Sequence, residues 1–327
     1  MKRIKSFEED LYGVNDQNFE DIALQLFKFQ VENNPVYHDF VTHIRRGQAK
    51  SLEEIPYLPI SFFKTHSIQT GTWIPETTFT SSGTTGQTAS RHLVKALPWY
   101  LEHTERIFRK FFGPLENYHV LALLPSYLER DGSSLVAMAD FFIRKSKSVY
   151  SGFYLNQHEA LVAKLQELKK SDKKVILLGV TFALLDLAEA YALDLSHCLI
   201  METGGMKGKR PEVTREEVHR FICSRFNVPS ILSEYGMTEL LSQAYSFGQG
   251  RFLIPSTMKI YIRDINDPFG REPVGKTGAI NVIDLANIYS CAFVETQDLG
   301  KINQDDSFEV LGRMDNSDIR GCNLMVE

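Results

Sequence analysis

The stretch TSSGTTG (residues 80–86) groups Ser and Thr hydroxyls with two glycines in one short segment. Backbone N–H groups of a glycine-rich loop, together with hydroxyl side chains, form a good cradle for phosphate oxygens. Gly83 and Gly86 allow positive φ angles and a close approach to a ligand. The segment is not a Walker A motif, because Gln87 and Thr88 follow Gly86 where that motif requires Lys and then Ser or Thr. A polar surface turn is the alternative, so the surrounding sequence must decide.

Outward from this segment, short apolar runs alternate with helical patterns, which predicts an α/β fold with a largely parallel sheet. The strand-like runs are HVLALLPS (119–126), KVILLGV (174–180), HCLIMETGG (197–205), SILSEYG (230–236) and AINVIDL (279–285). The helical patterns that separate the first four are DGSSLVAMADFFIRK (131–145), NQHEALVAKLQELKK (156–170), FALLDLAEAYAL (182–193) and REEVHRFICSRF (215–226). Apolar residues at helical spacing also predict a helix over 17–45. After about residue 250 the short strands and turns predict a smaller β-rich part.

The composition is that of an ordinary globular protein, with 327 residues of which 43% are hydrophobic and 24% are charged. A formal net charge of −5 without a dense Lys/Arg stripe argues against a nucleic-acid partner. The N-terminal MKRIKSFEEDLYG lacks the apolar core of a signal peptide, and no run of about 18 apolar residues predicts a membrane span. The cysteines are scattered without CxxC spacing, which argues against a zinc site or a disulfide scaffold. We therefore expect a cytoplasmic protein with reduced thiols.

A second polar motif, SEYGMTE (233–239), ends an apolar run at the carboxyl end of a predicted strand, where α/β proteins usually bind ligands. Tyr235 is suited to stack on a base, and Thr238 is suited to bond a phosphate. Glu239 is suited to ligate Mg²⁺, which prefers carboxylate and phosphate oxygens. Farther along, Asp298 in the segment TQDLGK is suited to bond both hydroxyls of a ribose. Together these residues favour a nucleotide site over a surface turn.

These segments, followed by GRMDNSDIRG (312–321), resemble in their order the motifs of the adenylate-forming (ANL) superfamily, which read S-G-T-T-G, Y-G-x-T-E, T-G-D-x-G and G-R-x-D. The resemblance implies an ANL-type large N-terminal domain, with layered mixed β-sheets and flanking helices, plus a small β-rich part. It also implies ATP and Mg²⁺ as cofactors. The residues it assigns to nucleotide binding are Ser81, Ser82, Gly83, Thr84, Thr85, Gly86, Gly204, Gly205, Tyr235, Gly236 and Asp298.

The resemblance also implies a role for each segment. Residues 81–86 would hold the β- and γ-phosphates, and METGGMKG (201–208) would lie along the adenine. Catalytic roles fall to Thr238 and Glu239, which would serve the α-phosphate and Mg²⁺, with Glu239 as the metal ligand. Arg313 would lie near the ribose or a phosphate.

The end of the chain, SDIRGCNLMVE, resembles LuxE-type acyl-protein synthetases, the ligase component of a bacterial fatty-acid reductase complex. LPSYLERDGSSLVAM (124–138) and IPYLPISFFK (55–64) also resemble that family. In that family a cysteine near the C-terminus takes the acyl group from the adenylate and passes it to a reductase subunit, and Cys322 matches this cysteine. Neighbouring Arg320 is suited to stabilise the thiolate. The cysteines assigned to core packing are Cys198, Cys223 and Cys291.

The resemblance predicts an AMP-binding domain over residues 1–312 and a hinge with a short tail over 313–327, the usual C-terminal domain being truncated. The implied reaction activates a carboxylic acid, expected to be a fatty acid, to acyl-AMP. The acyl group then passes to Cys322 and on to an acceptor such as an acyl reductase or an acyl-carrier protein. A phenylacetate-CoA-ligase-type enzyme, which would acylate CoA or a carrier without needing Cys322, is an alternative. A non-catalytic nucleotide-binding partner protein is another.

Several positions depart from the family pattern. Gln87 stands where many relatives have a lysine after the phosphate loop, and Gln297 replaces a glycine of the ribose motif. The lysine of the usual C-terminal domain is missing. The candidates to replace its charge are Lys64, Lys207 and Arg313, and no spacing argument selects one of them.

Two histidines, His66 and His92, flank the phosphate loop in the sequence. Local hydrogen bonding explains a lone histidine more often than catalysis does. Asp315 is a hinge residue by resemblance and a turn former by itself.

Overall fold

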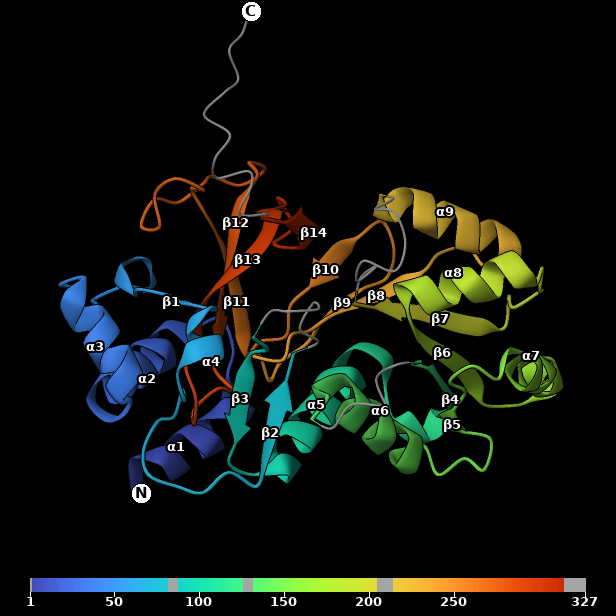
Figure 1. Cartoon of the computed structure of the whole chain (residues 1–327), viewed down its shortest axis with the longest axis horizontal. Helices are drawn as coiled ribbons and strands as arrows, with labels where there is room; N and C mark the ends of the chain where they lie inside the picture. The colour runs from blue at the N-terminus through green and yellow to red at the C-terminus, as the bar shows by residue number, and fades with distance from the viewer. Residues whose placement is uncertain (1, 82–87, 126–131, 205–213, 315–327) are drawn as a thin grey trace, which may run out of the picture. The chain divides into compact units, whose positions relative to one another are not determined.

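The computed structural model describes residues 2–81, 88–125, 132–204 and 214–314. The chain divides into two compact units, Met1–Thr72 with Ser256–Glu327 (the first unit) and Trp73–Pro255 (the second unit). Each unit combines helices with hydrogen-bonded strands (Figure 1). The predicted α/β fold class is therefore confirmed.

A mostly parallel sheet forms the centre of the second unit. Its strands are β4 (Tyr118–Leu123), β5 (Gly152–Phe153), β6 (Lys174–Val180), β7 (Cys198–Thr203), β8 (Leu232–Tyr235), β9 (Ala244–Ser246) and β10 (Arg251–Leu253). Their order is β10-β9-β8-β7-β6-β4-β5, in which β9 runs antiparallel to β8 and β10 and the other pairs are parallel. The first four predicted strand-like runs thus form β4, β6, β7 and β8. These strands are buried along nearly their whole length, as expected of parallel strands that are covered on both faces.

Helices cover both faces of this sheet. They are α5 (Leu97–Phe112), α6 (Ser134–Lys145), α7 (His158–Glu167), α8 (Thr181–Ala190) and α9 (Arg215–Phe226), with the short 3₁₀ helices η3 (Leu115–Asn117) and η4 (Leu168–Lys170). In Figure 1, α8 and α9 lie on one face of the strands, and α5 and α6 lie on the other. A capping box begins α9, because the Thr214 side chain accepts from the Glu217 N–H and the Glu217 side chain accepts from the Thr214 N–H. The predicted alternation of strands and helices is confirmed.

A separate antiparallel hairpin in the second unit is made of β2 (Thr77–Thr80) and β3 (Arg91–Val94). Its register pairs Phe79 with His92 and Thr80 with Arg91. Phe79 is buried against the ring of Tyr100, with the ring centroids 5.0 Å apart, so the hairpin is fastened to α5. This hairpin flanks the TSSGTTG segment.

The first unit contains the predicted β-rich part. Its strands β11 (Met258–Arg263), β12 (Gly278–Asp284), β13 (Phe293–Ile302) and β14 (Phe308–Arg313) pair antiparallel in chain order, and β1 (Leu58–Pro59) pairs parallel with β13. The helices are α1 (Lys2–Asp10), α2 (Phe19–Asn33), α3 (Pro35–His43) and α4 (Phe62–Thr65), with the 3₁₀ helices η1 (Leu11–Gly13) and η2 (Leu52–Glu54). The Tyr37 ring stacks on Phe293 at 6.1 Å and meets the Phe27 edge at 6.0 Å, which joins the helices to β13.

The helical pattern predicted over 17–45 is confirmed for most of its length, and it forms two helices that meet at Asn34. Pro35 has no N–H to continue α2, and it suits the first turn of the next helix. Asn34 caps α3 by accepting from the Tyr37 N–H at 3.1 Å, and it also donates to the Ser290 carbonyl at 3.0 Å. The break therefore lets one buried side chain fasten a helix start to the turn before β13.

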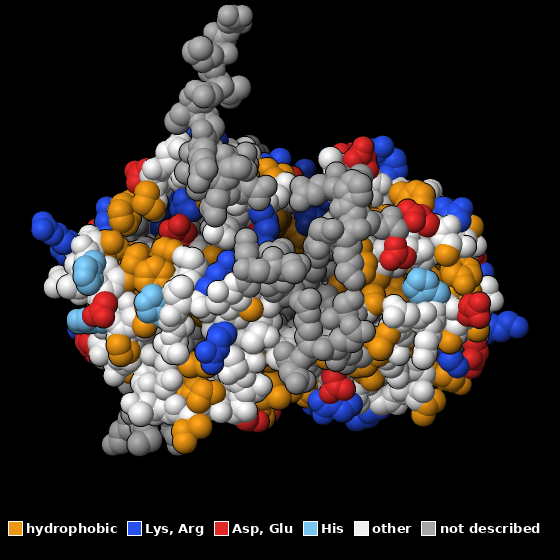
Figure 2. Space-filling model, in the orientation of Figure 1, with side chains coloured by type: hydrophobic (Ala, Val, Ile, Leu, Met, Phe, Trp, Pro, Cys, Tyr) orange, Lys and Arg blue, Asp and Glu red, His pale blue; other side chains and the backbone are white. Residues whose placement is uncertain are grey.

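Charged side chains are spread over the molecular face shown in Figure 2, where Lys and Arg are scattered among Asp and Glu. Within the described ranges, no helix is both long enough and apolar enough to cross a membrane.

Candidate functional site

The neck of the β2–β3 hairpin holds the start of the predicted phosphate loop. The Ser81 N–H donates to the Ser90 carbonyl at 3.1 Å, and the Ser90 N–H donates to Ser81 Oγ at 2.9 Å. These reciprocal bonds close the hairpin directly before the glycine-rich segment. The predicted phosphate-binding residues that lie outside the described residues are Ser82, Gly83, Thr84, Thr85 and Gly86.

Gly132 braces the same hairpin from another part of the chain. The Thr80 N–H donates to the Gly132 carbonyl at 2.8 Å. Gly132 has a φ of +82°, and a Cβ at this position would lie 2.7 Å from the Thr78 carbonyl oxygen. Only glycine therefore fits both the backbone angle and the close approach. Sequence reasoning missed this contact, although the Asp-Gly pair in RDGSS is a recognised turn pattern.

A buried histidine joins the hairpin to the SEYGMTE motif. His92 Nδ1 lies 2.8 Å from the Thr238 carbonyl oxygen, and since a carbonyl can only accept, the histidine carries its proton on Nδ1. Burial lowers the pKa of His92 to about 4, against the opposing effect of this hydrogen bond, so the ring stays neutral. His92 thus makes a long-range hydrogen bond that brings together two segments 146 positions apart.

The other residues of SEYGMTE lie at the carboxyl end of β8. Tyr235 is buried, with its ring centroid 5.9 Å from that of Phe252 in an edge-on arrangement. A Cβ on Gly236 would overlap Glu234 Oε1, so a larger residue at this position would have to displace the end of the Glu234 side chain. Glu239 is also buried. The motif is therefore a packed turn, and not a loose surface loop.

Glu234 lies beneath this turn in an environment that favours a neutral carboxyl. The Thr203 hydroxyl donates to Glu234 Oε2 from the neighbouring strand. Burial raises the pKa of Glu234 to about 7, and the Thr203 hydrogen bond only partly offsets it. A titrating carboxyl thus lies directly before the predicted adenine contact, Tyr235.

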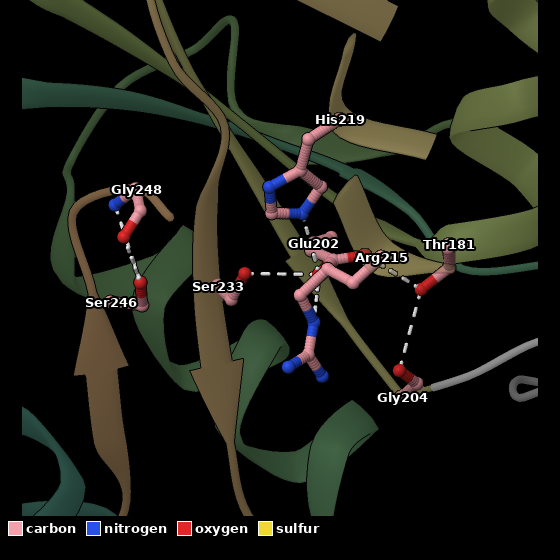
Figure 3. Close-up of polar contacts among 8 residues, drawn as sticks. All are labelled: Thr181, Glu202, Gly204, Arg215, His219, Ser233, Ser246 and Gly248. Carbon is pink, nitrogen blue, oxygen red and sulfur yellow. Dashed lines mark hydrogen bonds and ion pairs between the residues drawn. The ribbon is translucent and has the colours of Figure 1, made fainter. Parts of the chain in front are cut away.

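A buried carboxylate that sequence reasoning missed lies at the end of β7 (Figure 3). Glu202 Oε1 accepts from His219 Nε2 at 2.8 Å, from Ser233 Oγ at 2.9 Å and from Arg215 Nε at 3.2 Å. Glu202 Oε2 accepts from Thr181 Oγ1 at 2.9 Å. These donors come from α8, α9 and β8, so one carboxylate ties three elements to β7. A charged residue inside the apolar run HCLIMETGG was the available hint.

Two further predicted residues lie together in the first unit. Asp298 on β13 pairs in register with Arg313 on β14, and Arg313 Nε lies 3.3 Å from Asp298 Oδ1. The Asp298 backbone N–H donates to Thr296 Oγ1 at 3.1 Å, which fixes the strand at this position. The Asp298 side chain is 9% exposed and that of Arg313 is 70% exposed. TQDLGK therefore lies on β13 and the Gly312–Arg313 pair on the neighbouring strand β14, so a carboxylate and a guanidinium lie together.

The other predicted residues lie elsewhere in the fold or outside the described part of the chain. His66 is exposed, its Nδ1 lies 2.8 Å from Thr65 Oγ1, and its ring stacks on Phe62. Lys64 lies half-buried in the last turn of α4. The residues outside the described part of the chain are Gly205, Lys207, Asp315, Arg320 and Cys322. Of the remaining cysteines, Cys198 and Cys291 are buried and Cys223 is half-buried on α9, in agreement with packing roles.

The donor set suits Mg²⁺ held mainly by a nucleotide. Among the described residues, no group of three or more His, Cys, Asp and Glu side chains is arranged to hold a metal ion. Mg²⁺ bound through one carboxylate, phosphate oxygens and water needs no such group. Glu239 fits that requirement as the single carboxylate.

A model of the family described as "Acyl-protein synthetase, LuxE" matches residues 132–327, which is more than half of the chain. The chain belongs to the LuxE acyl-protein synthetase family. The family resemblance inferred from the sequence is thereby confirmed. The match to the LuxE family includes Gly204, Thr238, Glu239, Asp298 and Cys322.

Solved structures similar to this LuxE-family chain have the ANL fold. An open conformation of 2-hydroxyisobutyryl-CoA ligase, in complex with 2-HIB-AMP and CoA, has a TM-score of 0.69 at 14% identity, covering 92% of this chain and 70% of that one. ATP-bound MatB from Rhodopseudomonas palustris has a TM-score of 0.54 at 18% identity, covering 72% of this chain and 47% of that one. The chain thus spans about half the length of MatB. The comparison with curated proteins found no match.

Proposed function

We propose that this chain activates a carboxylic acid with ATP and then transfers the acyl group to a thiol. The match to the LuxE family over residues 132–327 carries this proposal. The described geometry supports it, since the hairpin that flanks TSSGTTG is bonded through His92 to Thr238 of the second motif. The pairing of Asp298 with Arg313 supports it as well. The similar structures include ATP-bound MatB and a CoA ligase in complex with 2-HIB-AMP, and their fold is the one found here.

In the first half-reaction, a carboxylate oxygen of the acid attacks the α-phosphorus of ATP. The bond from that phosphorus to the bridging oxygen breaks, and pyrophosphate leaves. Such a reaction is catalysed mainly by positioning and by neutralising charge. Residues Ser81 to Gly86 would hold the β- and γ-phosphates, Thr238 would contact the α-phosphate, and Glu239 would hold Mg²⁺, which neutralises phosphate charge when bound.

The family resemblance supplies the candidate contacts to the nucleoside. Gly204, Gly205 and Gly236 would allow close approach to the adenine, and Tyr235 would pack against it. Asp298 would accept from the ribose hydroxyls, with Arg313 near the ribose or a phosphate. Gln87 and Gln297 leave the pyrophosphate and ribose contacts with amide groups in place of the lysine and glycine of many relatives.

In the second half-reaction, the Cys322 thiolate attacks the acyl carbon of the mixed anhydride. The bond from that carbon to the phosphate oxygen breaks, AMP leaves, and a thioester forms. The acyl group would then pass to an acceptor protein such as an acyl reductase or a carrier protein. A fatty acid is the expected substrate, and a cytoplasmic location, where thiols stay reduced, is the expected setting.

Intact-mass measurement tests the proposal. The full chain is incubated with Mg·ATP and a panel of carboxylic acids, beside Cys322→Ser, and pyrophosphate is measured in parallel. An acyl adduct on the wild type that is absent from Cys322→Ser, with pyrophosphate released by both, is the expected result. Pyrophosphate without an adduct, with thioester formed only when CoA or a carrier is added, would show a CoA-ligase-type enzyme. ATP binding without any pyrophosphate would show a non-catalytic protein.

A further inference from the structure

Glu202 is an anion that the fold has to neutralise. It is 3% exposed, and a buried carboxylate is tolerated only when its oxygens are bonded and its charge is paired. Burial by itself raises the pKa of Glu202. The hydrogen bond and charge of His219, the charge of Arg215 and the Ser233 hydrogen bond outweigh burial and hold the pKa below its ordinary value. The donors around Glu202 are therefore oriented by a fixed negative charge.

One arm of the network reaches the end of β7. The Thr181 hydroxyl lies 2.9 Å from Glu202 Oε2 and 3.3 Å from the Gly204 carbonyl oxygen, so it is shared between the two acceptors. Gly204 has a φ of +72°, an angle at which the chain turns as it leaves the strand. The Glu202–Thr181 bond thus fixes the direction of the Gly204 carbonyl, at the first glycine of the segment assigned to adenine.

A second arm reaches Tyr235 through Arg215. The Arg215 Cζ atom lies 5.3 Å from the centroid of the Phe252 ring, in cation–π range. Phe252 in turn meets the Tyr235 ring edge at 5.9 Å. The Glu202 carboxylate bonds Arg215 Nε, and Arg215 in turn packs on Phe252. Glu202 therefore also influences the position of the Phe252 ring against Tyr235.

A third contact reaches the strand of Tyr235 directly. Ser233 lies two residues before Tyr235 on β8, and its hydroxyl donates to Glu202 Oε1. β7 and β8 pair Glu202 with Ser233 in register, so this bond joins the ends of the two strands that carry Gly204 and Tyr235. Three independent contacts thus lead from one carboxylate to the residues on either side of the assigned adenine position.

We infer that Glu202 is a positioning residue for the adenine part of the nucleotide site, holding Gly204 and Tyr235 in place through Thr181, Ser233 and Arg215. This inference rests on the proposed use of ATP, but it concerns binding and not turnover. The positioned groups are assigned to the base, whereas the phosphates are assigned to the loop after Ser81. Loss of the Glu202 charge is therefore expected to weaken binding of ATP and to leave binding of a bare polyphosphate unchanged.

The test measures the Kd of ATP and of inorganic tripolyphosphate by titration calorimetry on the full chain. Glu202→Gln keeps the shape of the side chain and removes its charge. We expect the Kd of ATP to rise about 10-fold or more, with the Kd of tripolyphosphate within about 3-fold of the wild type. A general loss of structure would weaken the binding of both ligands. The ratio of the two dissociation constants therefore separates a positioning effect from a folding defect.

Glu105→Gln is the matched control. Glu105 on α5 is also bonded to two cations, Lys145 at 3.1 Å and Arg109 at 3.4 Å, and the same substitution removes its charge at a place assigned no ligand. We expect both dissociation constants to stay within about 2-fold of the wild type, since the two cations that pair with Glu105 lie partly in solvent. An equal rise of the ATP constant in Glu105→Gln and Glu202→Gln would overturn the inference.

A second pair of variants keeps the inference testable if Glu202→Gln does not fold. Thr181→Val removes the hydroxyl shared with Gly204, and Thr181→Ser retains it. We expect Thr181→Val to raise the Kd of ATP about 3- to 10-fold and Thr181→Ser to restore it to within about 2-fold. Equal ATP affinity in both variants would overturn the inference.

Failure of the inference and failure of the proposed function have different outcomes. A wild type that binds ATP but releases no pyrophosphate with any acid contradicts the proposed function and leaves the binding ratios to decide on Glu202. Normal pyrophosphate release with unchanged ATP affinity in Glu202→Gln and Thr181→Val overturns the inference alone. A wild type that binds tripolyphosphate as tightly as ATP overturns it too.

Discussion

Glu202 and Glu234 each lie one residue before the end of neighbouring parallel strands, one position out of register, and they point to opposite faces of the sheet. Glu202 pairs with Ser233, and Glu234 pairs with Thr203, the residue after Glu202. Because side chains alternate along a strand, the two carboxyl groups meet different surroundings. Glu202 is bonded to Arg215 and His219, whereas Glu234 has a hydroxyl donor and burial raises its pKa to about 7. One acid is held charged and the other is held close to its titration point.

Glu234 predicts a pH-dependent stability. Its pKa of about 7 in the folded chain lies above the unfolded value near 4.5. The folded state therefore binds the proton more tightly, and the stabilisation is complete below pH 4.5 and is lost as the pH rises through 7. We expect the unfolding free energy of the wild type to fall, relative to Glu234→Gln, by an amount of up to about 3 kcal/mol across this window. Urea unfolding of both proteins at pH 5, 6, 7 and 8 measures it.

Glu234→Gln serves as its own control, because an amide resembles the protonated carboxyl in shape and does not titrate. Other groups titrate equally in the two proteins, so the difference between the curves isolates residue 234. Parallel curves over the whole range would show that Glu234 titrates normally in the folded chain.

The strands of the sheet were predictable from the sequence, whereas the side-chain hydrogen bonds at the carboxyl ends of those strands were not. Runs such as KVILLGV are long, apolar and bounded by turn residues, and they became β6 and its neighbours because local pattern decides such strands. The Glu202 cluster depends on Thr181, Arg215, His219 and Ser233, which are far apart in the chain. Nothing in their local sequence says that they meet, because the sheet order alone places their elements around β7.

The bond from His92 to Thr238 predicts that the β2–β3 hairpin and the SEYGMTE motif are mechanically linked. His92→Phe keeps an apolar ring but leaves the Thr238 carbonyl without this donor, at a cost of about 1–3 kcal/mol. His92→Asn offers an amide N–H to the same carbonyl. We expect His92→Phe to unfold at lower urea concentration and to release pyrophosphate at least about 10-fold more slowly. His92→Asn should lie between it and the wild type.

The pH dependence at this position has the opposite sign to that of Glu234. The pKa of His92 is about 4 in the folded chain and 6.5 in its ordinary state. The stability that the neutral His92 side chain contributes is present above pH 6.5 and is lost as the pH falls through 4. The wild type should therefore lose stability relative to His92→Asn as the pH falls from 6.5 to 4. A constant difference between these two proteins over that range would contradict a buried neutral histidine.

Gly236 lies against the carboxyl group of Glu234. A side chain at 236 would overlap the Glu234 carboxyl, which is buried and bonded to Thr203 and cannot easily move. We expect Gly236→Ala to lower the unfolding free energy by about 1–3 kcal/mol. In the double variant Gly236→Ala with Glu234→Ala the overlap is absent, so the two effects should be coupled by about 1 kcal/mol or more. Strict additivity in urea unfolding would show that the carboxyl is not the obstacle.

The order of TQDLGK and GRMD in the sequence indicated two motifs, but not that β13 and β14 would place them in one register. That pairing depends on where the turn between the strands falls and on the irregularity between Leu299 and Gly300, neither of which the motifs encode. The consequence is a contact between Asp298 and Arg313, two residues that are close both in strand register and in space.

Asp298 predicts a loss of ribose recognition without a loss of stability. Its partner Arg313 is 70% exposed, so the ion pair is worth about 0–1 kcal/mol, and Asp298→Asn should unfold at nearly the wild-type urea concentration. An aspartate that accepts from ribose hydroxyls forms charge-assisted hydrogen bonds, which the amide replaces poorly. We expect the KM for ATP in pyrophosphate release to rise about 10-fold or more in Asp298→Asn.

A nucleotide lacking one hydroxyl makes this prediction specific to the ribose. The wild type should bind 3′-deoxy-ATP about 10-fold more weakly than ATP, because the aspartate then loses one of its donors. Asp298→Asn should bind both nucleotides with nearly the same affinity, since the contact is already weakened. If Asp298→Asn still discriminates as strongly as the wild type, the hydroxyl is recognised by another group. Arg313→Lys, which keeps the charge beside Asp298, should preserve most of the discrimination and so separates the carboxylate from its partner.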